Sequence, residues 1–577
     1  MNKRTACPLD CYDACAILYE DKKLSGLKKG HTAGFLCPHL KHYDKYETFH
    51  MPRYKGEEIE MDEALQKLTE ILKSGEPEET LHYRGSGNFG LMQEVTDHFF
   101  ASYGANLTEG SLCDGAGAAG ITEGRGSNKN MPLCEIEKSE VVIIWGRNPH
   151  TTSSHLLPFI KDKTLIVIDP IKTKIARTAT LHIQLKPRGD LYLAMLISRF
   201  LHIENGCDTA FMDRYAPEYE DFYELTQSIR IKATLDEIDV TLGQIGKILE
   251  LVKNKKVAIV CGVGIQKYSN GADVLRAIDA LAVMLGLFGK EGCGVSYLGD
   301  SKEGIVSPFH TKSKKLSKVN TDFSKFKTVF VQGANPLSQM PDSMRVKASM
   351  QGVENLIYFG LYENETSEMA DLVIPAKNFL QKNDVRTSYS HNSMMFMDKV
   401  EECEQGIAEY YLSAFLCKAF DIALESEEFY LNHFKNFSVQ KMDGCRHVQN
   451  TETIPYQNGF DTDEGEFIFL DEIDTELDKD KRLFLLTPKS AKSLNSQFHR
   501  EENVYLNSAL GFNENEEVTV SSACGNVKLK VKTDDNVRED CVLIYSGTKG
   551  VNNLTSSKHS LEGKNAIYQE NKVEVNR

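Results

Sequence analysis

The dominant pattern along the chain is a short apolar run, then a turn with glycine, then a helix-length segment. Runs of this kind, rich in Val, Ile and Leu, occupy residues 140–145, 165–169, 256–261, 327–332 and 355–360. Such runs are typical of strands buried on both faces of a parallel sheet. Their alternation with helices predicts doubly wound α/β domains.

The polar and apolar positions between these runs predict several helices. Leucines recur on one face of segment 62–73, and a strand at 81–83 is followed by a helix over about 91–103. The most apolar stretches, Leu191–Leu201 and Ala277–Gly289, contain Arg or Asp and predict buried helices. No run of about 18 apolar residues exists, so the sequence predicts no membrane span.

The carboxyl end has a different pattern. From about residue 435 to 482 the sequence becomes acidic and irregular, which predicts a linker. Short β-rich runs with little helix follow at 483–486, 517–521, 527–531 and 542–545. This pattern predicts a small β-barrel.

Composition narrows the classes of partner and location. The chain has 577 residues, 41% of them hydrophobic, and a formal net charge of −16. This length corresponds to about four domain-sized units, and the negative charge argues against nucleic acid or an anionic membrane as partner. The residues before Cys7 form no secretory signal, and the Lys-Arg pair at positions 3–4 is not a twin-arginine signal. We therefore expect a cytoplasmic protein, exported only if a signal-bearing partner carries it.

One four-residue turn occurs twice. Gly146-Arg147-Asn148-Pro149 follows run 140–145, and Gly333-Ala334-Asn335-Pro336 follows run 327–332. Open parallel sheets bind nucleotides at the carboxyl ends of such strands, where glycine admits a phosphate. The repeat predicts two related dinucleotide sites. Asp169, at the end of the next run of the first copy, is expected to recognise a ribose or guanine edge.

Four cysteines near the amino end form a distinct chemical motif. Cys7, Cys11 and Cys15 fall within nine residues, and Cys37 follows a short loop. Four thiolates in this arrangement can hold one cubane 4Fe–4S cluster. Disulfides, structural zinc and ordinary buried cysteines are the alternatives; disulfides lack a secretory context here, and zinc sites usually contain two close cysteine pairs. We expect the cluster.

A fifth cysteine, Cys113, begins a segment of very small residues that runs to Gly120. With so little side-chain bulk, this backbone can approach another surface closely. A thiolate presented in this way suits a soft metal such as molybdenum or tungsten, and the alternative is a buried cysteine at a helix-packing site. Asp114 is either a proton donor to a substrate or a helix N-cap.

These motifs together resemble the molybdopterin oxidoreductases, the dimethyl-sulfoxide-reductase and formate-dehydrogenase superfamily. The matching stretches are Cys7-Pro-Leu-Asp-Cys11 with the third cysteine, and Gly34-Phe-Leu-Cys37-Pro38. The resemblance implies molybdenum or tungsten on two molybdopterin guanine dinucleotides, with Cys113 as the protein ligand. The family usually has Lys or Arg where this chain has His39, and we expect Lys41 to bridge cluster and pterin instead.

The resemblance also implies further cofactor contacts. Pro187-Arg188-Gly189-Asp190 is similar to a segment whose Asp contacts guanine, and the loop after run 256–261 is similar to a cofactor-lining loop. Beyond the two turns and Asp169, the expected contacts are Gly189, Asp190, Gly262, Gly264, Glu365, Thr366, Asp371, Asn495, Gln497 and Asn553.

The resemblance implies two-electron redox chemistry, with oxo transfer as one form of it. We expect Cys113 and Asp114 to act with Arg386 and His391, which lie in a polar loop and are expected to contact an anionic or oxo substrate. Electrons would pass through a pterin and the cluster to an electron-transfer protein or an iron–sulfur or flavin subunit. A metal-free scaffold subunit of a redox complex and a non-redox hydratase on the same cofactor are the alternatives. The sequence does not identify the small-molecule substrate.

The expected fold is α/β with four units. An iron–sulfur lobe occupies residues 1–48, and a first α/β domain combines 49–112 with 352–475. A second, dinucleotide-binding α/β domain of related doubly wound fold occupies 113–351. A β-barrel at 480–577 is expected to seal the cofactor.

Overall fold

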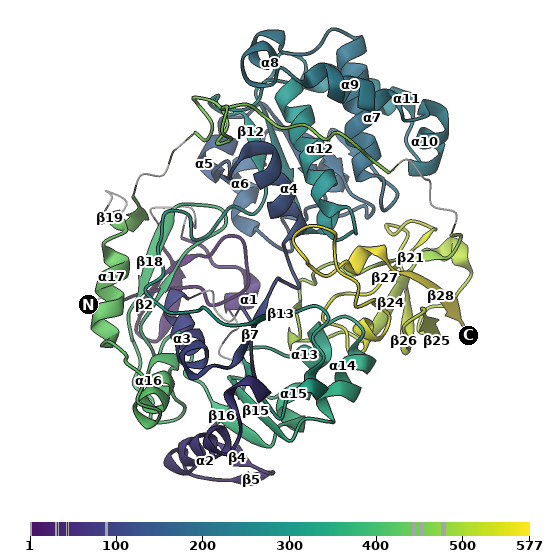
Figure 1. Ribbon diagram of the computed structural model, residues 1–577. Helices are drawn as coiled ribbons and strands as arrows, with labels where there is room; N and C mark the ends of the chain where they lie inside the picture. Colours follow the sequence, from purple (N-terminus) through teal and green to yellow (C-terminus); the bar gives the residue numbers. More distant parts are fainter. Residues whose placement is uncertain are drawn as a thin grey trace.

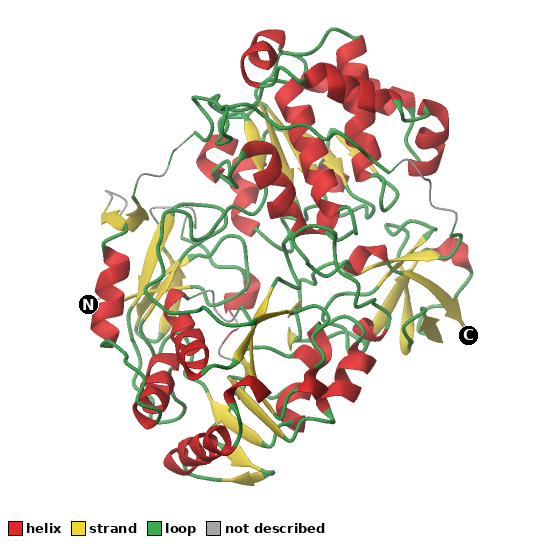
Figure 2. Cartoon of the chain, viewed as in Figure 1, coloured by secondary structure: helices red, strands yellow, loops and turns green. Residues whose placement is uncertain are grey.

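The chain folds around two mainly parallel β-sheets, with a cysteine-rich lobe and a closed barrel beside them (Figure 1). Figure 2 shows the strands of both sheets enclosed by helices, whereas the barrel consists mostly of strands and loops. This computed structural model describes residues 3–28, 32, 34–41, 43, 46–86, 90–440, 446–449, 452, 454–474 and 480–577.

The larger sheet has eight strands and lies at the bottom of Figure 1. Its strands from β13 to β16 are parallel, and β4 and β5 add an antiparallel edge. In spatial order they are β13 (Lys315–Ser317), β7 (Asn106–Glu109), β6 (Thr80–Arg84), β14 (Thr328–Gln332), β15 (Asn355–Gly360), β16 (Leu372–Pro375), β4 (Arg53–Tyr54) and β5 (Glu57–Glu58).

Helices cover both faces of this sheet because each presents an apolar stripe to it. Leu68, Phe99 and Leu412 bring α2 (Met61–Ser74), α3 (Glu94–Tyr103) and α16 (Glu409–Ala419) into one core. Val346 of α14 (Ser343–Met350) packs into the core on the other face. The short helices α13 (Pro336–Gln339) and α15 (Glu365–Met369) follow β14 and β15.

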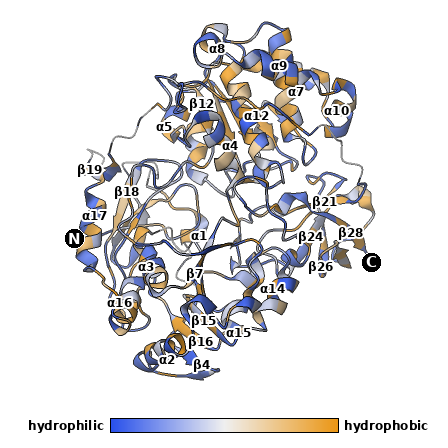
Figure 3. Ribbon diagram, viewed as in Figure 1, coloured by the Kyte–Doolittle hydropathy of each residue, from blue (hydrophilic) through white to orange (hydrophobic). Residues whose placement is uncertain are grey.

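The second sheet has five parallel strands and lies at the top of Figure 1. Figure 3 shows hydrophobic residues on its strands and on α12, whereas outer helices of the molecule, such as α14 on the eight-stranded sheet, carry hydrophilic residues. The strand order is β10 (Leu181–Ile183), β9 (Thr164–Ile168), β8 (Val141–Trp145), β11 (Val257–Cys261) and β12 (Gly294–Ser296). Its helices are α4 (Ala116–Arg125), α5 (Leu133–Ile136), α6 (Leu157–Ile160), α7 (Asp190–Ile203), α8 (Thr209–Tyr215), α9 (Tyr219–Gln227), α10 (Ile231–Ile238), α11 (Leu242–Val252) and α12 (Gly271–Met284).

The cysteine-rich lobe is a three-stranded meander with one short helix. It contains β1 (Lys3–Ala6), β2 (Ala16–Glu20), β3 (Lys23–Gly26) and α1 (Pro38–Lys41). It packs against a four-stranded sheet formed by β17 (Asp384–Arg386), β18 (Ser393–Met397), β20 (Arg446–Val448) and β19 (Ser438–Gln440), next to α17 (Glu427–Lys435). The lobe is therefore joined to a segment almost 400 residues away.

The carboxyl end forms the expected barrel. Its closed order is β21 (Leu483–Leu486), β27 (Cys541–Leu543), β24 (Asn503–Leu506), β26 (Asn526–Thr533), β25 (Glu517–Ser521) and β28 (Lys572–Asn576). A small hairpin of β22 (Ser493–Leu494) and β23 (Gln497–Phe498) precedes β24. The α/β fold with a carboxyl-terminal barrel confirms the predicted fold class.

Two expected boundaries differ from the observed pairing. β13 and β14 lie within 113–351 but pair with β7 and β6 of the eight-stranded sheet, because an apolar run predicts a strand and not the sheet that it joins. The strand β18, expected in the first α/β domain, belongs to a separate four-stranded sheet and packs against the cysteine-rich lobe through Met395 and Met397, whereas α16 stays on the eight-stranded sheet.

The prediction of a linker is wrong for residues 454–474. Phe460, Phe467 and Phe469 are buried in the core of the five-stranded-sheet unit. Ile468 donates its backbone N–H to the carbonyl of Gly124 in α4 at 3.0 Å. The many acidic residues of this stretch led to the linker prediction, although its aromatic residues are buried.

No helix in the described residues is long and apolar enough to cross a membrane.

Packing between α4 and α12 gives a first prediction. A Cβ atom at Gly120 would overlap the carbonyl oxygen of Ala272, whereas one at Gly246 on α11 would meet open space. Gly120→Ala should lower the free energy of unfolding by about 1–3 kcal/mol because α12 must shift. Gly246→Ala is the matched control and should raise it by about 0.5–1 kcal/mol. Urea unfolding measures both; equal effects would contradict the packing argument.

Candidate functional site

One large cavity lies where the two sheets, the cysteine-rich lobe and the barrel meet. Its volume is about 960 Å³. The carboxyl ends of β8, β9 and β11 line it from one sheet, and those of β14 and β15 line it from the other. The two glycine turns at Gly146 and Gly333 therefore border the same space. The turn that occurs twice in the sequence thus occurs once in each sheet.

The first turn is held by close backbone contacts. Gly146 has a φ of +63°, and a Cβ atom there would overlap Ile265. A Cβ atom at Gly262 would overlap the carbonyl of Gly146 itself. Arg147 donates from Nε to the carbonyl of Cys261 at 2.9 Å, and its guanidinium lies 4.2 Å from the ring centre of Tyr12. Gly146, Arg147, Asn148, Gly262 and Gly264 line the cavity, whereas Pro149 does not.

The second turn is held by side chains. Gly333 has a φ of +54°. Asn335 donates from Nδ2 to Glu365 at 2.8 Å and accepts at Oδ1 from the Thr366 hydroxyl at 2.8 Å. Arg500, which follows the β22–β23 hairpin, donates to the other oxygen of Glu365 at 2.6 Å. Gly333 and Asn335 face the cavity, and Glu365, Thr366 and Pro336 lie behind them.

Two carboxyl groups line the cavity beside the first turn: Asp169 follows β9, and Asp190 begins α7. Burial raises the pKa of Asp169 to about 7 and that of Asp190 to about 6. Trp145 donates from its indole N–H to Asp190 at 2.7 Å, and the backbone N–H of Ile171 donates to Asp169 at 2.8 Å. Both carboxyl groups line the cavity, while Gly189 only precedes α7. The other oxygen atoms of both carboxyl groups can accept hydrogen bonds from the N–H or O–H groups of a ligand in the cavity.

Cys113 lines the cavity just before the amino end of α4. The Ser111 hydroxyl accepts from the backbone N–H of Cys113 at 2.9 Å, and Gln266 donates to the Cys113 carbonyl at 2.9 Å. A Cβ atom at Gly115 would overlap the carbonyl of Gly563. The small residues after the thiol are therefore needed for backbone contact with the carboxyl-terminal segment. Burial raises the pKa of the Cys113 thiol.

Asp114 also faces the cavity. Tyr297 donates from its hydroxyl to Asp114 Oδ1 at 2.7 Å, and burial raises the pKa of this carboxyl. The ring of Tyr297 leaves no space for a Cβ atom at Gly117 in α4. Asp114 and Tyr297 therefore form a hydrogen-bonded pair that can carry a proton directly beside Cys113.

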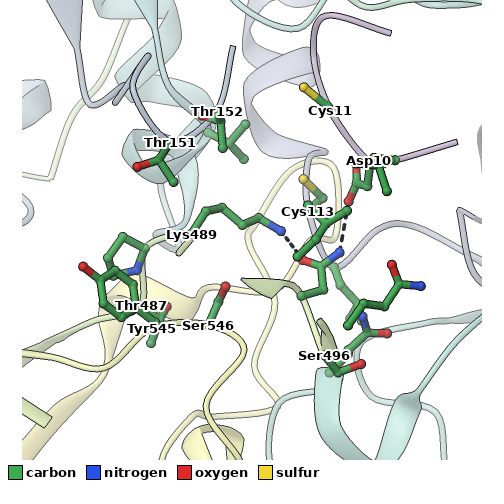
Figure 4. A pocket seen from close by; sticks show the side chains of 18 of the residues that line it. Asp10, Cys11, Cys113, Thr151, Thr152, Thr487, Lys489, Ser496, Tyr545 and Ser546 are labelled. Carbon is green, nitrogen blue, oxygen red and sulfur yellow. Dashed lines mark hydrogen bonds between the residues drawn. The ribbon is translucent and has the colours of Figure 1, made fainter. Parts of the chain in front are cut away.

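Two lysines that the sequence did not reveal, Lys267 and Lys489, lie in the cavity near Cys113. Burial lowers the pKa of Lys267 to about 8, and its Nζ donates to the carbonyl of Leu112 at 3.2 Å. Lys489 reaches into the cavity from the barrel and donates to Asn495, whose Nδ2 donates to Asp10 at 3.2 Å (Figure 4). Lysines are common on surfaces, so nothing in the local sequence distinguishes these two.

The four amino-terminal cysteines occupy one buried loop region. Cys7 and Cys15 are buried and Cys11 and Cys37 are half-buried, all as free thiols. Burial raises the pKa of Cys7 to about 12; the Arg386 guanidinium opposes this rise, and the charge of Cys37 adds to it. Buried thiolates need a cationic partner, so four sulfur donors here fit an iron–sulfur cluster. Cys11 also borders the main cavity, on the same side as Asp10 (Figure 4).

Arg386 and His391, expected to contact a substrate, lie against the cysteine-bearing loop 7–15. Arg386 donates from Nη2 to the carbonyl of Leu9 at 2.9 Å, and His391 Nε2 bonds to the carbonyl of Asp13 at 2.9 Å. Neither lines the cavity. Both hold the cysteine loop from behind, because the polar loop that carries them packs under the lobe.

Of the remaining residues expected at the cofactor, one lines the cavity and two lie outside it. Gln497 lines the cavity beside Asn495. Asp371 accepts from the backbone N–H of Leu356 at 2.8 Å, and Asn553 accepts from Ser343 at 2.6 Å, so both support the fold outside the cavity. The side chain of Lys41 lies outside the described residues.

The raised pKa of Asp169 gives a pH-dependent prediction. The folded pKa of about 7 lies above the ordinary value of 3.8 for an aspartate, so ionisation of Asp169 costs stability increasingly as pH rises from about 4 to 7. In cofactor-free protein, Asp169→Asn should gain stability at pH 8, by up to about 4 kcal/mol, and little at pH 4. Thermal unfolding at both pH values, with the exposed Asp162→Asn as control, measures this. An equal effect at both pH values would contradict it.

Comparison with known proteins identifies the family. The family model described as molybdopterin oxidoreductase matches residues 61–405, and the Molydopterin dinucleotide binding domain matches residues 483–571. The probable oxidoreductase YyaE of Bacillus subtilis is 26% identical over 69% of this chain and 66% of its own length. Formate dehydrogenase H of Escherichia coli is 23% identical over 60% of this chain and 56% of its own length.

The matched part of the chain thus spans less than two thirds of the length of each of these two relatives. Acetylene hydratase from Pelobacter acetylenicus shares the fold, with a TM-score of 0.81 and 16% identity over 100% of both chains. The family match covers more than half of the sequence and confirms the resemblance seen in its motifs. The chain belongs to the molybdopterin oxidoreductase family of enzymes.

Proposed function

We propose that this enzyme is a molybdenum or tungsten bis(molybdopterin guanine dinucleotide) oxidoreductase with Cys113 as the protein ligand to the metal. The observation that carries the proposal is that the Cys113 segment borders the same cavity as two glycine turns from two different sheets. Two equivalent strand ends facing one thiol suit two dinucleotides that meet at one metal. When bound, the cofactor supplies two-electron chemistry at that metal.

The residues present fit this cofactor. The turns at Gly146 and Gly333 leave room for phosphate groups, since their positive φ values suit glycine. Asp169 and Asp190 would accept hydrogen bonds from a guanine edge at the first turn. Asn495 and Gln497, from the barrel side, would contact the pterins, as would Gly262 and Gly264 from the turn that follows β11.

A 4Fe–4S cluster at Cys7, Cys11, Cys15 and Cys37 completes the proposal. Because Cys11 borders the cavity, the cysteine loop is near enough to serve as the next electron carrier. The natural partner is an electron-transfer protein or an iron–sulfur or flavin subunit, and a cytoplasmic location suits this chemistry. Its substrate is a small molecule that enters the cavity.

Charge around Cys113 favours a small anion as that substrate. Lys267 and Lys489 both face the cavity near the thiol. Asp114, hydrogen-bonded to Tyr297, is positioned to move a proton at its carboxyl oxygen. Formate and nitrogen oxyanions are examples, and relatives of this chain include formate dehydrogenase H of Escherichia coli and a nitrate reductase of Shewanella frigidimarina.

A hydratase on the same cofactor is the second candidate. The buried Asp114–Tyr297 pair favours it, because such a pair can deliver a proton to a substrate without electron transfer. The two candidates differ in one measurable respect: only the oxidoreductase needs an electron donor or acceptor for turnover.

Replacing Cys113 tests the leading proposal. Cys113→Ala should retain the iron–sulfur cluster and lose turnover by more than the roughly 10- to 100-fold that loss of an outer-shell partner costs. Anaerobic assays with reduced viologen and oxo-acceptors, and with oxidised dye and formate, measure this. Parallel assays without dye register hydration of an alkyne. Cys417→Ala, buried in α16 away from the cavity, is the control; full activity of Cys113→Ala would remove the ligand assignment.

Replacing Lys267 tests the substrate class. Lys267→Met should raise KM for an anionic substrate at least about tenfold relative to a neutral one such as trimethylamine N-oxide, because losing one partner of a desolvated charge pair costs about 2 kcal/mol or more. Lys267→Arg keeps the charge and should retain most of the affinity. Metal content is measured in each variant. Equal effects on charged and neutral substrates would argue against an anion site.

A further inference from the structure

One of the proposed cluster ligands, Cys15, lies in a buried group with two residues, Asp13 and His155, that have no role in the proposed function. Asp13, Cys15 and His155 each contribute one potential ligand atom, and these atoms lie within 4.8 Å of one another. All three residues are buried. His155 lies in a 3₁₀ turn (Ser154–Leu156) of the five-stranded-sheet unit, about 140 residues from Cys15 in sequence.

One backbone contact and one ring contact hold His155 in place. Its backbone N–H donates to the Asp13 carboxylate at 3.2 Å. The ring of Phe35, two residues before Cys37, lies against the imidazole with a centroid distance of 4.0 Å and an interplanar angle of 34°. His155 is therefore confined between the segments that carry Cys15 and Cys37.

The segment that carries His155 also reaches the main cavity. It begins at the Gly146 turn, and Thr151 and Thr152 line the cavity opposite Cys11 and Asp10 (Figure 4). Arg147 donates to the Ser153 hydroxyl at 3.3 Å, which fixes the bend before His155. One short stretch thus contacts both the proposed dinucleotide site and the cysteine loop.

We propose that His155 is a positioning residue for the iron–sulfur cluster, donating a ring N–H to the sulfur of Cys15 and thereby setting the cluster's reduction potential. This inference rests on the proposed function, specifically on a cluster at the four cysteines. An imidazole carries at least one N–H in either protonation state. Hydrogen bonds to cluster sulfurs stabilise the more negative, reduced form and so raise the potential. A residue serving only to fill space here would not need a buried polar ring.

The test is His155→Phe, which keeps a ring against Phe35 and removes the N–H. Dithionite, through redox mediators, supplies one electron to the cluster, and no bond in the protein forms or breaks. We expect unchanged iron content and a lower midpoint potential in an EPR-monitored titration. The expected change is about tenfold in the reduction equilibrium, equal to about 59 mV for one electron.

His391→Phe is the matched control, because His391 is a half-buried histidine whose ring also contacts this region, at the carbonyl of Asp13. A potential unchanged in His155→Phe, or lowered equally in His391→Phe, would overturn the inference. If His155→Phe loses the cluster, His155→Gln decides: a potential close to wild type supports donation by the side chain, and a potential lowered about tenfold overturns it. Absence of a cluster from the wild-type protein would instead refute the proposed function.

Discussion

The structure depends on one constraint: two parallel sheets direct the carboxyl ends of their strands into a single cavity. The chain turns sharply at Gly146 and Gly333, where the backbone has positive φ. At the first turn the packing is so close that a side chain on Gly262 would overlap the Gly146 carbonyl. A bulkier residue at Gly262 would therefore push apart the turns that follow β8 and β11.

The reactive groups lie on irregular segments that distant residues hold. Arg386 and His391 bind carbonyl oxygens of the cysteine loop from a segment almost 380 residues away. Gln266 and Lys267 do the same for the Cys113 segment. Irregular backbone has unpaired carbonyl groups that need donors when buried. These side chains meet that need and fix the thiols without a helix or strand through them.

Charge is distributed unevenly between the surface and the cavity. The whole chain has a net charge of −16, yet lysines face the interior from several elements. Lys318 donates to the carbonyl of Arg84 at 2.8 Å, and burial lowers its pKa to about 8, as it does for Lys267. Cations held by carbonyl oxygens in a confined space are stabilised further when an anionic ligand enters. The cavity is therefore suited to phosphate-bearing and anionic ligands inside an acidic protein.

The sequence alone determined the features that depend on local pattern. Apolar runs predicted the strands of both sheets and the barrel, and the repeated turn, the four cysteines and the Cys113 segment indicated the family. Only the tertiary structure decided that β14 pairs with β6 rather than joining β8, and that Arg386 and His391 lie behind the cysteine loop. It alone brought Lys267, Lys489 and His155 to the sites of interest. The physical reason is that strand partners and side-chain environments depend on contacts between residues far apart in sequence, which periodicity does not record.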